Sequence, residues 1–232
     1  TPQEIFFYRF LIAYLGIWVI SPKRLFTNNW QDELWLVAGG IFGGSLYFFT
    51  ENTALGITQA SNVSFIICTA PLLTTILSLL FYKSEKASKG LIYGSLLALM
   101  GVGLIVFNGS FVLKISPIGD LLTLLAALSW AFYSLIIKKM AGRYPTVFIT
   151  RKIFFYGVLT ILPAFLLHPL QPDAAVLLQP GVLFNLLFLA VLASLICYVL
   201  WNVVLKQLGT VRASNYIYLN PLVTMIASSL IL

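Results

Sequence analysis

Charged residues are scarce in this chain of 232 residues. Lys, Arg, Asp and Glu make up only 9% of it, whereas about 25% is usual for a soluble domain. A globular domain of this length cannot cover its surface with so few charges. An ordinary soluble enzyme, a disordered chain and a nucleic-acid-binding protein are therefore excluded. The net charge of +7 forms no phosphate-binding face, because the basic residues fall between long apolar runs.

Residues that bind metals or nucleotides are equally scarce. One His and two Cys leave no zinc site built from these residues. No stretch matches the glycine-rich loop of ATP-binding proteins. An intramembrane enzyme would require a nucleophile with a base, or a metal site, and neither is visible. We predict no enzyme activity, no cofactor and no metal.

What the chain does have is long apolar runs, and 60% of its residues are hydrophobic. A membrane-spanning helix needs about 20 mostly apolar residues, whereas the strands of a membrane barrel are about 9–11 residues long and alternate strictly. The runs therefore predict an all-α fold, a polytopic bundle of helices in a lipid bilayer. The eight expected spans are 5–20, 34–54, 60–82, 90–108, 120–139, 147–168, 182–206 and 212–232.

The basic residues predict the orientation of these spans. All but two of the 14 Lys and Arg residues fall in or beside the connections that follow odd-numbered spans. The exceptions are Arg9 and Lys114. Since cytoplasmic connections carry the excess of positive charge, the odd-numbered spans should run from the outside to the cytoplasm. The expected location is the inner membrane of a bacterium.

The third and eighth spans resemble each other. Each begins with Ala-Ser-Asn, at 60–62 and 213–215, and each contains a proline at mid-span, Pro71 and Pro221. The first and sixth spans match more weakly, with the same period of five. An odd period places the two copies in opposite orientations, and inverted repeats around a central site are typical of secondary transporters.

The repeat also predicts how the chain is organised. The first repeat would occupy 1–118 and lack its first helix, and the second would occupy 119–232 and lack its last helix. The complete protein should then have ten helices, so we expect this sequence to be an internal piece.

Several short motifs together resemble one family. They are GDLL at 119–122, AALSWAFYS at 126–134, YVLWN at 198–202, KQLG at 206–209 and NPL at 220–222. In this order they are similar to the EamA-type permeases of the drug/metabolite transporter superfamily. The resemblance implies ten helices in two inverted halves, both termini in the cytoplasm, and export of small metabolites.

These observations predict a secondary transporter that moves small amphipathic metabolites, such as amino acids or their derivatives, by alternating access. A nucleotide-sugar or organic-phosphate transporter of the same superfamily is the alternative. Such a transporter would require several cationic residues that face its pocket. An intramembrane enzyme is the alternative outside this class. The partners expected are a small-molecule metabolite and the lipid bilayer, and the oligomeric state is open.

Pro71 and Pro221 are candidate hinges at a central pocket. Proline removes a backbone donor and interrupts a helix, and in a membrane such breaks line a protein interior or a water-filled cavity. A simple packing kink is the alternative.

Glu51 is the acidic residue well inside a span, where a carboxylate is expensive and therefore a functional candidate. With the adjacent Asn52 it is a candidate substrate-binding residue. An ion pair with Arg9 on the neighbouring span would gate the outer mouth or hold a zwitterionic ligand, and a structural pair is the alternative. Glu51 is also a candidate proton site, so antiport and facilitated diffusion both remain open.

Aromatic residues with nearby amides provide the remaining candidates for a pocket that suits an amphipathic solute. The alternative is an aromatic belt at the membrane interfaces. These candidate substrate-binding residues are Trp130, Tyr133, Tyr198, Trp201, Asn202, Asn215 and Tyr218.

Two further features have structural interpretations. Arg151 and Lys152 lie one turn inside the sixth span and act either as an inner counterpart of Arg9 or as a cytoplasmic anchor. Glycines at 39, 40, 43 and 44 place small residues four apart in the second span, which predicts close packing against another helix.

Overall fold

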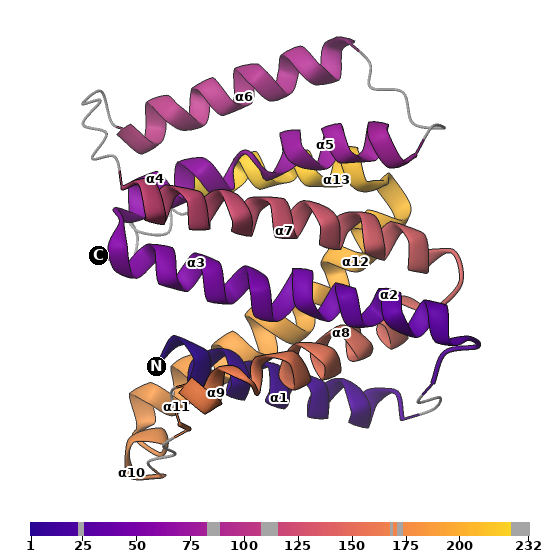
Figure 1. Cartoon of the computed structure of the whole chain (residues 1–232), viewed down its shortest axis with the longest axis vertical. Helices are drawn as coiled ribbons and strands as arrows, with labels where there is room; N and C mark the ends of the chain where they lie inside the picture. The colour runs from indigo at the N-terminus through magenta and orange to yellow at the C-terminus, as the bar shows by residue number, and fades with distance from the viewer. Residues whose placement is uncertain (23–25, 83–88, 108–115, 168, 171–173, 224–232) are drawn as a thin grey trace. The chain divides into compact units, whose positions relative to one another are not determined.

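The computed structural model describes residues 1–22, 26–82, 89–107, 116–167, 169–170 and 174–223. Every regular element within these ranges is a helix, as the all-α prediction requires. Figure 1 shows these elements. In chain order they are α1 (Pro2–Ile20), α2 (Trp30–Gly40), η1 (Ile41–Ser45), α3 (Leu46–Ile57), α4 (Ala60–Ile67), α5 (Ala70–Phe81), α6 (Lys89–Phe107), α7 (Pro117–Ala141), α8 (Thr146–Ile161), α9 (Ala164–Leu167), α10 (Ala174–Leu177), α11 (Pro180–Leu187), η2 (Phe188–Ile196), α12 (Cys197–Leu208), α13 (Thr210–Ser214) and η3 (Asn215–Leu219).

Five expected spans coincide with helices that are long and apolar enough to cross a membrane. They are Pro2–Ile20, Asn62–Phe81, Pro117–Ala141, Thr146–Leu166 and Pro180–Leu208. Their length and composition indicate a protein that crosses the bilayer several times.

The other three expected spans are not established. The second, 34–54, is covered by α2, η1 and α3, which are not among the five. Within 90–108 the apolar stretch is the shorter Tyr93–Leu104. The last, 212–232, is described only as far as residue 223. The count of eight spans therefore stays a prediction, and Lys23, Arg24, Lys83, Lys86 and Lys114, used to orient them, lie outside the described residues.

The chain divides into two compact units. Unit 1 consists of Thr1–Phe49 and Ile136–Gln207, and unit 2 consists of Thr50–Leu135 and Leu208–Leu232. Each unit takes helices from both halves of the chain, so the units differ from the repeats expected at 1–118 and 119–232.

Helices α1 and α8 pack in opposite directions in unit 1. Phe7, near the start of α1, contacts Phe165, which follows α8, with ring centroids 5.6 Å apart. At the other end, the carbonyl of Ser21, which follows α1, accepts a hydrogen bond from Arg151 in the second turn of α8. These helices are the first and sixth expected spans.

The glycines of the second expected span pack against α8, as their spacing predicts. A Cβ at Gly40 would lie 2.5 Å from the Tyr156 Cβ and 2.9 Å from the backbone nitrogen of Gly157. A Cβ at Gly44 would lie 3.1 Å from the Phe10 ring. The absence of a side chain at Gly40 is what allows the two backbones to approach.

Two π-helical segments interrupt the helices of unit 1. Segment η1 joins α2 to α3 within the second expected span, and η2 joins α11 to α12 within the seventh. Such segments are rare in proteins, and those that occur are often found at functional sites.

Unit 2 contains the break predicted at Pro71. Helix α4 ends at Ile67 and α5 begins at Ala70. Pro71 thus occupies the first turn of a new helix, where its missing N–H is not needed, and the break lies just ahead of it. Around Pro221 the helix is also irregular, because the 3-10 segment η3 ends at Leu219 before helical geometry resumes.

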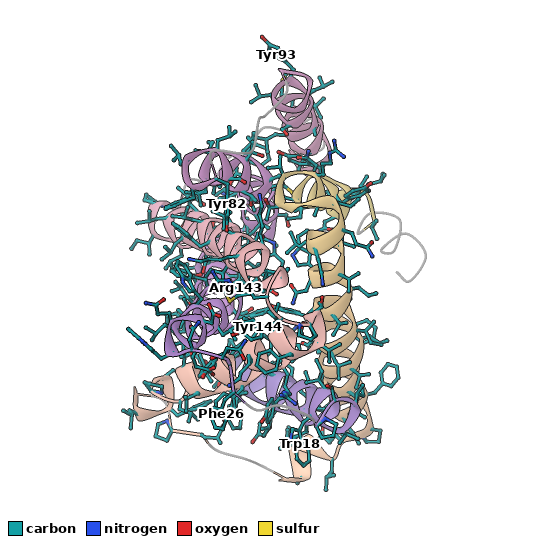
Figure 2. The ribbon with its side chains drawn as sticks, turned by 90° about the vertical axis from the view of Figure 1, so that its right-hand side faces the viewer. Trp18, Phe26, Tyr82, Tyr93, Arg143 and Tyr144 are labelled. Atoms are coloured by element: carbon teal, nitrogen blue, oxygen red, sulfur yellow. The ribbon has the colours of Figure 1, made fainter. Side chains whose placement is uncertain are left out.

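Other contacts of unit 2 join its helices through polar groups. The Ser78 and Thr210 hydroxyls, on α5 and α13, lie 3.4 Å apart. The Tyr82 hydroxyl donates to the Leu135 carbonyl at 3.2 Å, and Figure 2 labels this tyrosine.

Replacing Gly40 with Ala should destabilise the protein by about 1–3 kcal/mol, because the methyl group would meet backbone atoms of α8. The thermal unfolding midpoint in detergent should fall. Gly94→Ala in α6 is the matched control, since a Cβ there meets nothing within 4 Å and should leave the midpoint unchanged or raise it slightly. Equal midpoints for the two variants would contradict the packing described.

Candidate functional site

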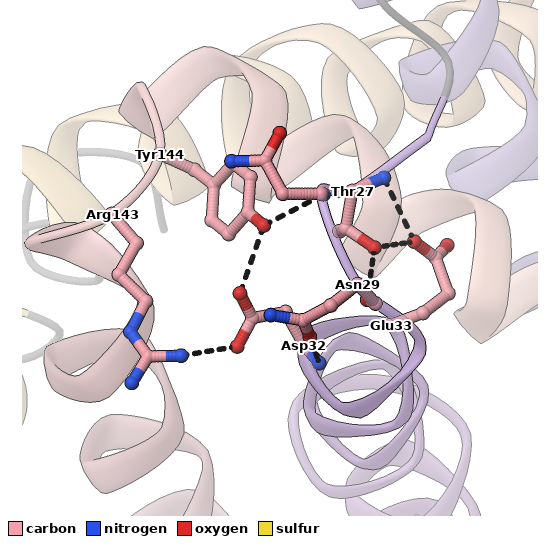
Figure 3. A network of polar contacts seen from close by, with 7 residues as sticks. Thr27, Asn29, Asp32, Glu33, Arg143 and Tyr144 are labelled. Carbon is pink, nitrogen blue, oxygen red and sulfur yellow. Dashed lines mark hydrogen bonds and ion pairs between the residues drawn. The ribbon is translucent and has the colours of Figure 1, made fainter.

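Two adjacent acidic residues at the start of α2 organise a polar network in unit 1 (Figure 3). Asn29 caps the helix, since its side-chain oxygen accepts a hydrogen bond from the Asp32 backbone N–H at 2.8 Å. The Asp32 carboxylate accepts hydrogen bonds from Arg143 Nη1 at 2.5 Å and from the Tyr144 hydroxyl at 2.8 Å. Asp32 is 3% exposed, so its charge is compensated by these contacts rather than by water.

Glu33 carries the second half of this network. Its Oε2 accepts hydrogen bonds from the Thr27 backbone N–H at 3.2 Å and from the Thr27 hydroxyl at 2.6 Å. Its Oε1 pairs with the Lys152 ammonium and accepts a hydrogen bond from the Tyr156 hydroxyl. The start of α2 is thereby joined to α8, at the end predicted to face the cytoplasm.

The two cations of α8 point into unit 1. Arg151 is 2% exposed and donates to the Ser21 carbonyl, and Lys152 is 6% exposed and pairs with Glu33. A surface anchor would remain accessible to headgroups and water, so the structure does not place these cations in the anchoring role. A buried charge requires a partner of opposite sign or a hydrogen-bond acceptor, and both residues have one.

Asp32 and Glu33 are not among the residues predicted from the sequence. One signal was present, because two of only seven acidic residues stand side by side ahead of an apolar run. Their partners could not be identified from the sequence, since Glu33 and Lys152 are 119 positions apart.

Arg9 lies on the face of α1 that contacts η2. Its Nε donates to the Ser194 hydroxyl at 2.8 Å, and its guanidinium carbon lies 4.6 Å from the Phe48 ring centroid. The expected partner Glu51 belongs to the other unit, so the Arg9–Glu51 pair stays a prediction. Within unit 1, Arg9 is a half-buried cation that is oriented by the Ser194 hydroxyl and the face of the Phe48 ring.

Tyr198 and Asn202 face the interior of unit 1. The Tyr198 hydroxyl donates to the Gly43 carbonyl in η1 at 2.6 Å, and the Asn202 amide donates to the Thr150 hydroxyl at 2.9 Å. Both residues are buried, whereas Trp201 between them is half-buried. In this conformation Tyr198 and Asn202 connect α12 to η1 and α8, and their role in substrate binding stays a prediction.

The unit 2 candidates include an aromatic pair on α7. The rings of Trp130 and Tyr133 lie 5.1 Å apart, as their spacing predicts, and Tyr133 is fully buried. On η3, the Asn215 side chain accepts a hydrogen bond from the Ser95 hydroxyl at 3.2 Å, and Tyr218 is half-buried.

The structure thus distributes the predicted residues over both units. Those in unit 1 are Arg9, Tyr198, Trp201 and Asn202, and those in unit 2 are Glu51, Asn52, Pro71, Trp130, Tyr133, Asn215, Tyr218 and Pro221. Glu51 and Asn52 are half-buried in α3. The single pocket expected from the sequence stays a prediction.

A cavity of about 420 Å³ lies in unit 1 beside the start of α1. Its walls are mostly apolar and come from α1, α10, α11 and η2, with Glu4, Tyr8 and Asn185 among the polar residues. None of the predicted binding residues lines it, and nothing in the sequence pattern pointed to it.

The long apolar helices, the π segments and the proline-associated breaks define a class, the multi-pass membrane proteins with interrupted spans. Within this class the chain belongs to the EamA-like transporter family, whose model matches residues 1–107 and 117–232. It is therefore a membrane transporter, and transporters of this family act on small molecules.

Individual relatives agree with this assignment. An uncharacterized transporter of Archaeoglobus fulgidus is 30% identical over 229 residues, which cover 97% of this chain and 78% of that protein. A probable amino-acid metabolite efflux pump of Salmonella typhimurium is 28% identical over 66% of this chain and 53% of that one. A protein of the same description from Escherichia coli is 22% identical over 96% of this chain and 74% of that one.

A solved crystal structure shows the same fold. Its chain has 20% sequence identity and a TM-score of 0.76, and the match covers 98% of this chain and 79% of that chain.

The pKa of Glu33, which lies ahead of the expected span 34–54, makes the network sensitive to acid. Burial raises this pKa, but the hydrogen bonds from Lys152, Thr27 and Tyr156 outweigh burial and hold the pKa below its ordinary value. The ionised form is therefore favoured in the folded protein. Its contribution to stability is fully present above the unfolded-state pKa and is lost as the pH falls through the folded-state pKa.

Replacing Glu33 with Gln should lower the unfolding midpoint at pH 7 and remove part of its dependence on pH. The difference between the variant and the wild type should shrink as the pH is lowered below the ordinary carboxyl range, because the wild-type carboxylate is then protonated as well. Thermal unfolding followed at several pH values checks this. A difference that stays constant down to the acid limit would show that Glu33 acts through packing alone.

Proposed function

We propose that this protein is a secondary transporter that moves amino acids or similar small amphipathic metabolites by alternating access, in the inner membrane of a bacterium. Two relatives described as probable amino-acid metabolite efflux pumps support this substrate class. The observation that carries it is Arg9, a cation held inside a span by Ser194 and Phe48.

The chemistry of Arg9 suits a substrate carboxylate. A guanidinium has five N–H donors in a planar fork that matches a carboxylate, and the bond from Nε to Ser194 orients that fork. The Phe48 face supports the guanidinium without competing as an anion. We infer that Arg9 holds the carboxylate of the substrate while the aromatic candidates contact its apolar part.

Three observations support two inverted repeats as the basis of alternating access. The family model matches in two segments, 1–107 and 117–232. The π segments occur in the second and seventh expected spans, which are five apart, and the interruptions near Pro71 and Pro221 occur in the third and eighth. Helices α1 and α8, from the first and sixth, run antiparallel. We propose repeats at 1–118 and 119–232 within a protein of ten helices.

The alternative substrate class, nucleotide sugars or organic phosphates, is less well supported. It would require several cations facing one pocket, and Arg151 and Lys152 are instead engaged by the Ser21 carbonyl and Glu33.

A flux assay in proteoliposomes tests the proposal directly. Vesicles loaded with unlabelled amino acids, amines, nucleotide sugars or organic phosphates are mixed with the labelled compound outside. Counterflow for one or more amino acids, and none for the phosphates, is expected. Counterflow for phosphates alone would favour the alternative, and turnover of a lipid or peptide would indicate an enzyme.

Replacing Arg9 with Gln should raise the half-saturating concentration of carboxylate-bearing substrates about 10–100-fold, because a hydrogen bond to a charged group is worth about 1.5–3 kcal/mol. Amines that lack the carboxylate should be affected little. Ser194→Ala is the matched control, since it removes the orienting partner but keeps the cation. Equal losses for both classes of substrate would show that Arg9 is structural.

Replacing Glu51 with Gln should lower transport while leaving the amount of protein in the membrane unchanged, because a carboxylate inside a span is retained for function rather than for packing. Glu51→Asp keeps the charge and should retain part of the activity. If the wild type couples transport to protons, a pH gradient should drive accumulation only when a carboxylate is present. Full transport by the Gln variant would remove Glu51 from the mechanism.

A further inference from the structure

The Lys152 ammonium lies close to four aromatic side chains. A cation within about 6 Å of an aromatic ring centroid is attracted by the negative face of the ring. Here the distances from Nζ to the centroids are 5.2 Å for Phe26, 5.4 Å for Tyr156, 6.0 Å for Phe148 and 6.0 Å for Phe155. With the Glu33 carboxylate, these four rings form what we call the ammonium cage. An ion pair by itself does not require four rings.

The carboxylate of the cage has hydrogen-bond donors other than Lys152. Glu33 accepts two hydrogen bonds from Thr27 and one from the Tyr156 hydroxyl. These donors belong to groups that do not move with the lysine side chain. If the ammonium left, the hydrogen bonds from Thr27 and Tyr156 would still engage the carboxylate, so the cage is organised to accept another ammonium group.

Both the entrance and the occupant favour exchange. Phe26, which Figure 2 labels, has an exposed fraction of 73%, and the Glu33 side chain is 21% exposed. The cage therefore opens to its surroundings on the side of Phe26, ahead of α2. Lys152 reaches it through a flexible four-carbon stem with rotatable bonds, so its charged end can withdraw when another ammonium group takes its place.

We propose that the ammonium cage is a binding site for an organic ammonium group, and that Lys152 occupies it until such a group displaces it. The proposal rests on the proposed function, because the amino group of an amino acid is such a group. The site differs from the carboxylate site at Arg9 and lies at the end of unit 1 predicted to face the cytoplasm. It would capture the amino group of a substrate that enters from that side.

Displacement can be measured as accessibility of Lys152. The intact protein in lipid nanodiscs is treated briefly with an amine-acetylating reagent, and acetylation of each lysine is quantified by peptide mass spectrometry. Choline is the probe, because its quaternary ammonium suits an aromatic cage and lacks an amine that would consume the reagent. The neutral isostere 3,3-dimethylbutan-1-ol is the matched control compound.

Saturating choline should raise the acetylation rate of Lys152 about tenfold, as expected when the displaced form changes from a minor to a major population. The neutral isostere should have no effect. Lys139 is the internal control, because its ammonium contacts a single ring outside the cage, with its Nζ 3.7 Å from the Trp35 ring centroid. Its acetylation rate should stay the same. An unchanged rate for Lys152, or equal acceleration by the isostere, would overturn the proposal.

Two variants confirm which groups form the cage. Glu33→Gln should expose Lys152 without choline and abolish the effect of choline. Phe155→Leu should retain the effect but raise the half-saturating choline concentration about two- to fivefold. This factor corresponds to the free energy of one cation–π contact. A Phe155→Leu response identical to the wild type would remove the rings from the site.

The labelling experiment requires no transport. If choline exposes Lys152 but no amino acid shows counterflow, the cage stands and the proposed substrate class fails. If amino acids show counterflow but no ammonium compound exposes Lys152, the proposed function stands and the cage is only a structural ion pair.

Discussion

A helix bundle in an apolar surrounding must provide a partner for every charge that it buries, and unit 1 depends on this constraint. In the second turn of α8, Arg151 donates to the Ser21 carbonyl and Lys152 pairs with the Glu33 carboxylate. Asp32, beside Glu33 in α2, accepts hydrogen bonds from Arg143 and from the Tyr144 hydroxyl. Removing one member would leave another charge buried without compensation, which costs far more than the pair contributes. These contacts therefore fix how the start of α2 meets α8.

The same constraint applies to the backbone. Where η1 departs from the α-helical pattern, the Gly43 carbonyl accepts a hydrogen bond from Tyr198, a side chain of α12. Where the chain breaks between α4 and α5, the Thr69 hydroxyl donates to the Ile66 carbonyl at 2.7 Å. Interrupted helices persist in a membrane protein only if nearby groups satisfy the backbone in this way.

Much of the fold follows from the sequence because the bilayer fixes the length of a helix. Five expected spans coincide with long apolar helices, and the break near Pro71 follows from the missing N–H of proline. The break lies ahead of Pro71 because proline is tolerated in the first turn of a helix. The division into units was not predictable, since it depends on packing between distant segments.

The candidate site was less predictable than the fold. The contact between Trp130 and Tyr133 follows from helical periodicity, but the hydrogen bonds of Tyr198 and Asn202 depend on partners in η1 and α8. Ion pairs between distant helices have no local pattern, which is why the network around Asp32 and Glu33 emerged only from the structure. The π segments likewise have no side-chain signature that would reveal them.

The π winding of η2 also determines which single-residue deletions this segment can tolerate. A helix closed by i→i+5 bonds holds about one residue more per turn than an α-helix. Losing a single residue between 188 and 196 would let the segment revert to regular α geometry with α12 still close to its present phase, because each remaining residue would then turn through the full angle of about 100° of an α-helix. Tyr198 and Asn202 would keep facing their acceptors. A single-residue deletion should therefore be tolerated far better within η2 than between Tyr198 and Asn202, where the later residue would rotate by roughly 100°.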